Sequence, residues 1–404
     1  MMSIFRRIII IGNRKKHRIG LVPFFTIVLL TSFLHGFSSP ADALSTETAE
    51  LKIAEFDFLT PEMFGAAGDG ITDDTAALNA AIRKASETCG IVKFDGLKHY
   101  RCAKTIQLAS DVELNMNGCL ITVHEVISFD KDAPAMAYDG FHDIIVRDGV
   151  FYSTNSFAIA HAKNVLLDNC TFIKCGGNHF IELCASQNIT IRDCRFLGQA
   201  TEGGAKEMLQ LDVCEPSSFR HFSDESSEAY DDTPLDNVLI ERCIFTSYRD
   251  EERLYPMHCA IGGHVCNKVQ NTNLIIRNCV ICESDGNGVY INNWDHVLIE
   301  GCTIANIAEQ AVGMRYSCND VCIRENMLRN YGSDYAIKAA YAQYAKNGLT
   351  ISCNFCVPKG NLADIVKCAG LKITDNYCGM NSGEMVQTKD CKNCFIKNNF
   401  TFPN

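Results

Sequence analysis

The sequence lacks an excess of basic residues, a zinc-type cysteine pattern and, over most of its length, any long apolar run. Its 404 residues contain 37 Lys and Arg against 48 Asp and Glu, which gives a formal net charge of −11. Affinity for nucleic acid comes largely from basic residues that neutralise phosphates, so nucleic acid is not the expected partner. The C-x-x-C pairs do not recur at the spacing of a zinc site, so no structural metal is expected. Beyond residue 43, no apolar stretch is long enough to span a membrane.

The first 43 residues have the pattern of a signal peptide. Six basic residues precede the apolar stretch "IGLVPFFTIVLLTSFLHGF", and Ala41 and Ala43 supply an A-x-A cleavage pattern. We therefore expect a signal peptide over 1–43, cleaved near Ala43, followed by a linker over 44–55. This predicts a secreted or cell-surface protein, with an uncleaved membrane anchor as the alternative.

One short unit recurs along the rest of the chain. Copies such as "NVLLDNCTF", "NITIRDCRF" and "NVLIERCIF" begin at residues 164, 188, 237, 273, 296, 320, 348, 370 and 393, and a further copy, "HDIIVRDGVF", begins at 142. Apolar and variable residues alternate within each copy, which is typical of a half-buried strand, and repetition at this period is typical of a solenoid. The L-x-x-L-x-L-x-x-N consensus of leucine-rich repeats is absent. The repeats therefore predict a stack of parallel β-coils.

The seventh position of the unit holds a small residue in each of the nine copies from 164 onward. These residues are Cys170, Cys194, Cys243, Cys279, Cys302, Asn326, Asn354, Asn376 and Asn399. Stacked coils repeat at ~4.8 Å, so this position predicts an internal ladder along the stack. In an exported chain, 22 cysteines would ordinarily indicate disulfides. Here we expect the ladder thiols to be reduced and to act as small buried spacers.

A different motif, "FGAAGDGITDDTAALNAAIRKA", begins at residue 64, before the repeats. Asp73 or Asp74 can cap a helix over 73–86, and the apolar face of that helix can cover the open end of the first coil. This stretch closely resembles the amino-terminal motif of the pectate-lyase superfamily, which includes polygalacturonase-like enzymes and phage tailspikes. The resemblance implies an all-β solenoid, a right-handed parallel β-helix with an N-terminal capping helix.

The domain organisation follows from the repeats and the cap together. We expect one β-helix domain over 56–404, with the cap at 56–90 and coils from about 91 to 404. Two long steps between repeats indicate insertions, which we place at about 197–208, 213–236 and 246–258. Long loops on a compact scaffold are usually functional, so these insertions are expected to wall a cleft.

The second strand of each central coil carries unusual polar residues. Six apolar residues are expected to point inward, namely Ile181, Leu209, Ile261, Val289, Val312 and Ile337. Neighbouring side chains must then point to the opposite face. They predict a cleft over six coils that binds a polysaccharide through His179, Gln210, Tyr290, Asn292, Arg315 and Lys338. Arg315 and Lys338 suit an acidic polysaccharide.

The same face offers acid–base chemistry. Asp212 and His264 occupy one column on neighbouring coils, within ~5 Å at the backbone, where they can hydrogen-bond. Glu182 lies on the order of 8 Å from Asp212, which suits the carboxylate pair of an inverting glycosidase. We therefore predict a secreted, polygalacturonase-like glycoside hydrolase in which these two carboxylates act as acid and base. His264 would shuttle a proton, and Glu207 is the reserve acid.

The polygalacturonase resemblance supports this site only in part. A central aspartate followed one coil later by a Gly-His pair matches Asp212 and the "GGH" at 262–264. The paired aspartate of that family is absent, because Val213 follows Asp212, and "GMRYS" does not match its Arg-x-Lys motif.

Two other functions stay open. A uronate polysaccharide lyase would need a base, from Arg315, Lys338, Tyr290 or His264, and Ca²⁺ could then be bound by Glu182, Glu207 and Asp212. Otherwise no cofactor is expected. A non-catalytic surface glycan-binding or adhesion protein would use the same face, with sugars stacked on Tyr290, Trp294 and Tyr316.

Overall fold

The computed structural model describes residues 57–402 except 130–135, 153–156, 200–205, 223–226, 267, 343–346, 358–360 and 380–383. The described residues all belong to one compact unit, Ile53–Asn404. The predicted signal peptide at 1–43 and the linker at 44–55 lie outside the described residues. No helix in the described part of the chain has the length and apolar character needed to cross a membrane.

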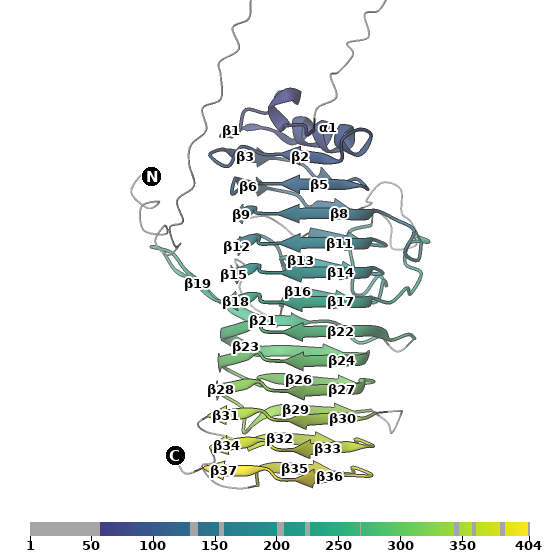
Figure 1. The fold of residues 1–404 in the computed structure, drawn as a ribbon, viewed down its shortest axis with the longest axis vertical. Coiled ribbons are helices and arrows are strands. Elements are labelled where there is room, and N and C mark those ends of the chain that lie inside the picture. The colour runs from purple at the N-terminus through teal and green to yellow at the C-terminus, as the bar shows by residue number, and fades with distance from the viewer. Residues whose placement is uncertain are drawn as a thin grey trace, which may run out of the picture. The chain divides into compact units, whose positions relative to one another are not determined.

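The unit is a stack of parallel β-coils, as the repeats predict (Figure 1). One face is a 12-stranded sheet, to which each repeat unit contributes a strand. Its strands are β2 (Ile91–Lys93), β5 (Val112–Asn115), β8 (His142–Arg147), β11 (Lys163–Asp168), β14 (Gln187–Arg192), β17 (Asp236–Glu241), β22 (Asn271–Arg277), β24 (Trp294–Glu300), β27 (Asn319–Arg324), β30 (Leu349–Ser352), β33 (Leu371–Thr374) and β36 (Phe395–Lys397).

The other two faces join into a 23-stranded sheet through the long strand β23 (Val280–Asn292), which belongs to both. One face contains β1 (Asp69–Asp73), β3 (His99–Cys102), β6 (Leu120–Val123), β9 (Val150–Tyr152), β12 (Thr171–Cys175), β15 (Arg195–Gln199), β18 (Ile244–Thr246), β25 (Thr303–Ile307), β28 (Met327–Tyr331), β31 (Phe355–Val357), β34 (Tyr377–Gly379) and β37 (Phe400–Phe402). The site face contains β4 (Ile106–Gln107), β7 (Ile127–Phe129), β10 (Phe157–Ala160), β13 (Ile181–Cys184), β16 (Glu207–Asp212), β21 (Met257–Gly262), β26 (Val312–Tyr316), β29 (Tyr335–Tyr341), β32 (Asn361–Val366) and β35 (Val386–Lys389). A short antiparallel hairpin, β19 (Tyr248–Arg249) with β20 (Leu254–Tyr255), lies in the third predicted insertion.

The helix α1 (Thr75–Ser86) covers the first coil at one end of the stack (Figure 1). A 3-10 helix, η2 (Pro61–Phe64), precedes it. Leu78, Ala81 and Ile82 of α1 are buried, as the apolar face predicts. Asp74 is the N-cap residue, but its carboxylate accepts the Ala67 and Gly68 amides rather than a helix amide. The aspartate therefore orders the glycine-rich turn, and the helix begins two residues later than predicted.

The interior consists of ladders of like residues. Phe151, Phe172, Phe196 and Phe245 stack face to face, with ring centroids 4.8–4.9 Å apart. At the seventh position of the repeat, the cysteines give way to an asparagine ladder, in which each buried carboxamide donates to the next along the stack. All 22 cysteines are free in this structure, and the ladder cysteines Cys170, Cys194, Cys243, Cys279 and Cys302 are buried.

Charge alternates along the outer surface of the 12-stranded sheet. The paired positions run Arg147, Asp168, Arg192, Glu241, Arg277, Glu300 and Arg324 from coil to coil. Three neighbouring pairs along this column are bonded to each other, namely Arg192 with Asp168 at 2.9 Å, Arg277 with Glu241 at 2.8 Å and Arg324 with Glu300 at 2.7 Å, while Arg147 pairs with Glu113 and Asp148. The arginines on this face are thus neutralised by the protein itself.

Candidate functional site

The strand register confirms the predicted column on the site face. Glu182, Gln210, Gly262, Tyr290, Gly313, Lys338 and Asp364 are direct neighbours from one coil to the next. A second column two residues further along pairs Cys184 with Asp212, and Asn292 with Arg315. The arrangement follows from inward apolar anchors such as Leu209 and Val289, which are fully buried.

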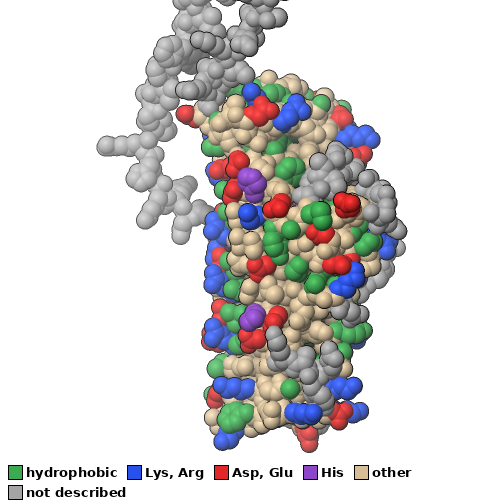
Figure 2. Space-filling view, turned by 90° about the vertical axis from the view of Figure 1, so that its right-hand side faces the viewer, with side chains coloured by type: hydrophobic (Ala, Val, Ile, Leu, Met, Phe, Trp, Pro, Cys, Tyr) green, Lys and Arg blue, Asp and Glu red, His purple; other side chains and the backbone are tan. Residues whose placement is uncertain are grey.

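The second insertion covers the first part of this column. Phe219, Phe222 and Tyr230 of the insertion pack with Ala158 and Ala160 of β10 in a small hydrophobic cluster separate from the main core. Figure 2 looks onto one side of the stack and shows hydrophobic side chains gathered at mid-height among acidic ones. The insertion was predicted to wall a cleft, but it also covers the N-terminal part of the column.

Several predicted contact residues are consequently buried rather than open to a substrate. Glu182 is 9% exposed and pairs with His221 of the insertion at 2.9 Å. Gln210 is 2% exposed and donates to the Ser218 carbonyl at 2.5 Å. The sequence prediction that these side chains face solvent is wrong, because it did not account for a loop packed over them.

His179 and Asn292 are also buried, and each supports a neighbouring backbone. His179 Nδ1 donates to the Glu207 carbonyl oxygen at 2.7 Å. Asn292 Nδ2 donates to the Gly263 carbonyl oxygen at 2.8 Å, next to His264. Trp294, which the adhesion hypothesis assigned to sugar stacking, is 1% exposed and belongs to the core.

An open cleft of about 630 Å³ lies next to the part of the column that the insertion covers. Four residues of the predicted site, Glu207, Tyr290, Arg315 and Lys338, line it together with Asn287, Glu309, Gln310, Ser333 and Asp334. A smaller hollow of about 200 Å³ shares four of these residues and reaches Asp364. Asp364 continues the column after Lys338, so extending the alignment by one coil would have identified it.

Two glycines, Gly262 and Gly313, leave room for side chains that line the cleft. A Cβ atom on Gly313 would lie 2.4 Å from Cδ2 of Tyr290, so the tyrosine ring lies directly over this residue. A Cβ atom on Gly262 would lie 2.6 Å from Cγ of Glu207. The Arg315 guanidinium stands 5.5 Å from the centre of the Tyr290 ring, within cation–π range. The aromatic face, the cation and the acid are thus held side by side.

Asp212 and His264 form the expected pair beside the cleft. His264 Nδ1 lies 2.9 Å from Asp212 Oδ2, and the His264 amide donates to Oδ1 at 2.5 Å. Asp212 is buried, while about half of the His264 side chain is exposed. The hydrogen bond to Asp212 raises the pKa of His264 to about 8. Burial raises the pKa of the Asp212 carboxyl, and the bonds from His264 oppose that rise.

Glu207 has the properties of a proton donor. Burial raises the pKa of its carboxyl, while the positive charge of a protonated His179 would lower it. Its side chain lines the cleft, and Oε2 stands 3.7 Å from His179 Nδ1. Of the predicted acids, Glu207 is therefore better placed than Glu182 to reach a bound molecule.

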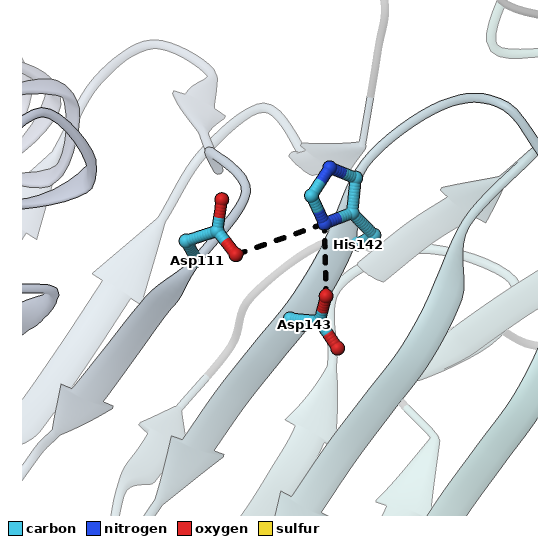
Figure 3. A group of neighbouring side chains, drawn as sticks. All are labelled: Asp111, His142 and Asp143. Carbon is cyan, nitrogen blue, oxygen red and sulfur yellow. Dashed lines mark hydrogen bonds and ion pairs between the residues drawn. The ribbon is translucent and has the colours of Figure 1, made fainter.

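The carboxylates suggested for Ca²⁺ do not converge. Among the described residues, the group that brings three candidate ligand atoms within 4.8 Å of one another is Asp111, His142 and Asp143, shown in Figure 3. His142 Nδ1 lies 3.0 Å from Asp143 and 3.8 Å from Asp111, where β5 and β8 of the 12-stranded sheet begin and not on the site face. Glu182 and Asp212 are each bonded to a histidine instead.

The fold is a right-handed parallel β-helix, as the repeats and the cap motif predict. A family model described as "Right handed beta helix region" matches residues 259–403. Phage tailspikes share the fold, as the sequence motif implied. The tailspike protein of E. coli bacteriophage HK620, solved in complex with a pentasaccharide, has a TM-score of 0.60 at 12% identity over 86% of this chain and 67% of that chain.

Two further matches are to proteins of Streptococcus pneumoniae. Plasmin and fibronectin-binding protein A of Streptococcus pneumoniae (strain ATCC BAA-255 / R6) is 25% identical over 284 residues, which are 60% of this chain and 38% of that protein. The present chain thus matches well under half the length of this relative. The crystal structure of PfbA, a surface adhesin of Streptococcus pneumoniae, has a TM-score of 0.70 at 20% identity over 86% of this chain and 92% of that chain.

Proposed function

We propose that this protein is a cell-surface adhesin that binds an acidic glycan along the cleft from Glu207 to Asp364. The observation that carries the proposal is the cleft itself, which presents an aromatic face, two cations and several amide and carboxylate groups over neighbouring coils. Sugar recognition needs such convergent polar groups beside an apolar surface. The likeness to a surface adhesin and to a tailspike solved with a pentasaccharide supports the same role.

The charge of the expected ligand follows from Arg315 and Lys338. Neither forms an ion pair with any residue that the structure describes, whereas Arg192 and Arg324 on the 12-stranded sheet are both paired. Two cations without carboxylate partners in a concave site favour an anionic group on the ligand. The Tyr290 ring, which lies beside Arg315, suits the apolar face of a pyranose.

Binding to uronate-rich and neutral polysaccharides tests this proposal. We expect Arg315→Ala to weaken binding of the acidic polysaccharide by about tenfold, and the difference to shrink at high salt, since screening removes charge attraction. Arg324→Ala, which removes an arginine from the opposite sheet, is the matched control. Equal binding of both polysaccharides, or binding of plasmin or fibronectin with no glycan bound, would contradict the proposal.

A second function, glycoside hydrolysis, is favoured by one specific arrangement. The Asp212–His264 pair stands beside the cleft that Glu207 lines. Glu207, an acid whose pKa is raised by burial, and a hydrogen-bonded Asp–His pair that can act as a base therefore face the same space. Glu207 would protonate the leaving oxygen, and Asp212 with His264 would activate water. Release of reducing ends alone would indicate a hydrolase, reducing ends with unsaturated products a lyase, and binding with neither an adhesin.

A further inference from the structure

The outer surface of the 12-stranded sheet carries a stripe of aliphatic side chains. Six consecutive strands, β8, β11, β14, β17, β22 and β24, pair in register, and Figure 1 shows them one above another. The central outward residues of these strands are, in order, Ile145, Leu166, Thr190, Leu239, Ile275 and Leu298. Each of them is partly exposed, whereas the residues before and after it in the strand are buried in the core. A contiguous apolar stripe on an outer surface favours an interaction site.

Two polar columns flank this aliphatic stripe. Two residues before its members lie the exposed residues Asp143, Asn164, Asn188, Asn237, Asn273 and His296. Two residues after its members lie the first six residues of the charge column, from Arg147 to Glu300. Stacked coils repeat at ~4.8 Å, so the six coils give this face a length of about 24 Å. An apolar centre with a polar rim is the composition of a protein–protein interface.

The charge column of this face is complementary to a reversed copy of itself. Two copies can pack face to face about a two-fold axis that runs parallel to the strands and passes between β14 and β17. The strand β8 of one copy then lies over β24 of the other, β11 over β22, and β14 over β17. Every facing pair in the charge column is of opposite charge, namely Arg147 with Glu300, Asp168 with Arg277 and Arg192 with Glu241.

The other two columns fit the same axis. Along the stripe, Ile145 faces Leu298, Leu166 faces Ile275, and Thr190 faces Leu239. In the first polar column, Asp143 faces His296, and the four asparagines face one another, where carboxamides can both donate and accept hydrogen bonds. An axis that passed through a strand instead of between two strands would bring like charges together along the whole charge column, which is strongly unfavourable.

The charges on this face do not oppose such packing. Each of the six charged residues already has an oppositely charged partner in its own chain, so no lone charge is buried when a second copy covers it. The cleft lies on another face of the stack, and packing through the 12-stranded sheet therefore leaves it open.

We propose that this face is the interface of a homodimer, in which two copies of the chain pack sheet against sheet about the two-fold axis between β14 and β17. Sheets that pack face to face lie ~10 Å apart with their side chains between them. The two aliphatic stripes form the centre of the interface, and the polar columns form its rim. The interface is isologous, since the same patch of each copy contacts the other.

Sedimentation equilibrium of the wild-type chain tests the proposal, and we expect a dimer at concentrations of about 10 µM and above. Leu239→Glu places two carboxylates beside the axis and should raise the dissociation constant by about 100-fold or more, because like charges then meet in an apolar contact. Val280→Glu changes an exposed aliphatic residue on another face of the stack. It is the matched control and should leave the dissociation constant unchanged.

A charge swap tests the position of the axis. Asp143 and His296 are both about half exposed and lie five coils apart in one chain, about 24 Å, so they can face each other only across the dimer. Asp143→Lys and His296→Glu should each weaken the dimer by about threefold to tenfold, whereas the double variant should return toward the wild type, because opposite charges face each other again. The proposal is overturned if the wild type is monomeric up to about 100 µM, if Leu239→Glu leaves the dimer intact, or if the effects of the two charge changes add.

Discussion

The imidazole of His264 is bonded to a carboxylate that solvent cannot reach. His264 Nδ1 lies 2.9 Å from Asp212 Oδ2, and the backbone amide of the same histidine binds the other oxygen at 2.5 Å. Gly263 makes this turn possible, because a Cβ atom there would lie 2.2 Å from the Leu211 carbonyl oxygen. The carboxylate thus fixes both the ring and the turn that carries it, and leaves Nε2 pointing away from the pair.

This relationship predicts how His264 titrates. Its pKa is raised from 6.5 to about 8, so the bond stabilises the fold fully below pH 6.5 and that stabilisation is lost as the pH rises through about 8. In Asp212→Asn, the pKa of His264 should fall back toward 6.5. Titration of the imidazole by NMR measures both values. Asp285→Asn, which removes the carboxylate bonded to His258, is the control and should leave His264 unchanged.

Catalysis, if the cleft hydrolyses glycans, depends on the same pair and on Glu207. Asp212→Asn, His264→Ala and Glu207→Gln should each lower turnover by about 10²-fold or more, whereas Glu182→Gln should have little effect, because Glu182 is covered by the insertion. Initial rates of reducing-end release on a polysaccharide that the wild type cleaves give the comparison. Full activity in the first three variants would place the chemistry elsewhere.

The asparagine ladder should dominate the stability of the C-terminal coils. Asn354 is fully buried, accepts hydrogen bonds from Asn326 and donates to Asn376 and the Ile323 carbonyl. Asn354→Ala would leave several buried polar groups unpaired, each at a cost of about 1–3 kcal/mol, so the free energy of unfolding should fall by about 2–4 kcal/mol. Urea unfolding measures the loss. Asn399→Ala, at the partly exposed end of the ladder, should cost less, and equal losses at the two sites would contradict this account.

The charge column on the 12-stranded sheet predicts that its ion pairs stabilise the fold to different extents, according to their burial. Glu241 is buried and pairs with Arg277 at 2.8 Å and Arg242 at 3.0 Å, whereas Glu300 is more exposed and pairs with Arg324. Glu241→Gln should lower the free energy of unfolding by about 1–2 kcal/mol and Glu300→Gln by less than about 1 kcal/mol, since solvent screens the more exposed pair. Urea unfolding in low salt and in 1 M salt would compare them, and the reverse order would contradict the prediction.

The fold could be predicted from the sequence because its determinants are local and repeated. The alternating apolar residues and the seventh-position ladder recur along the chain, and the cap motif precedes them once. The strand register that the repeats imply is the one observed. The positions of Tyr290, Arg315 and Lys338 on the site face follow from that register. What the pattern could not reveal is which parts of the column a loop covers. His221 reaches Glu182 from 39 residues away, and no periodic signal marks that contact.

Gly313, which lies beneath the Tyr290 ring, gives the sharpest test of the binding site. Gly313→Ala would place a methyl group 2.4 Å from the Tyr290 ring, and the backbone of Gly313 does not require glycine, so the ring should move while the coil remains folded. We expect Gly313→Ala and Tyr290→Ala to weaken glycan binding by similar factors, on the order of tenfold. In the Tyr290→Ala background there is no ring to displace, so adding Gly313→Ala should have no further effect. Isothermal titration calorimetry on the four proteins of this cycle measures the coupling. Additive losses would mean that Gly313 acts independently of the tyrosine, and unchanged binding in both single variants would mean that the glycan does not rest on this ring.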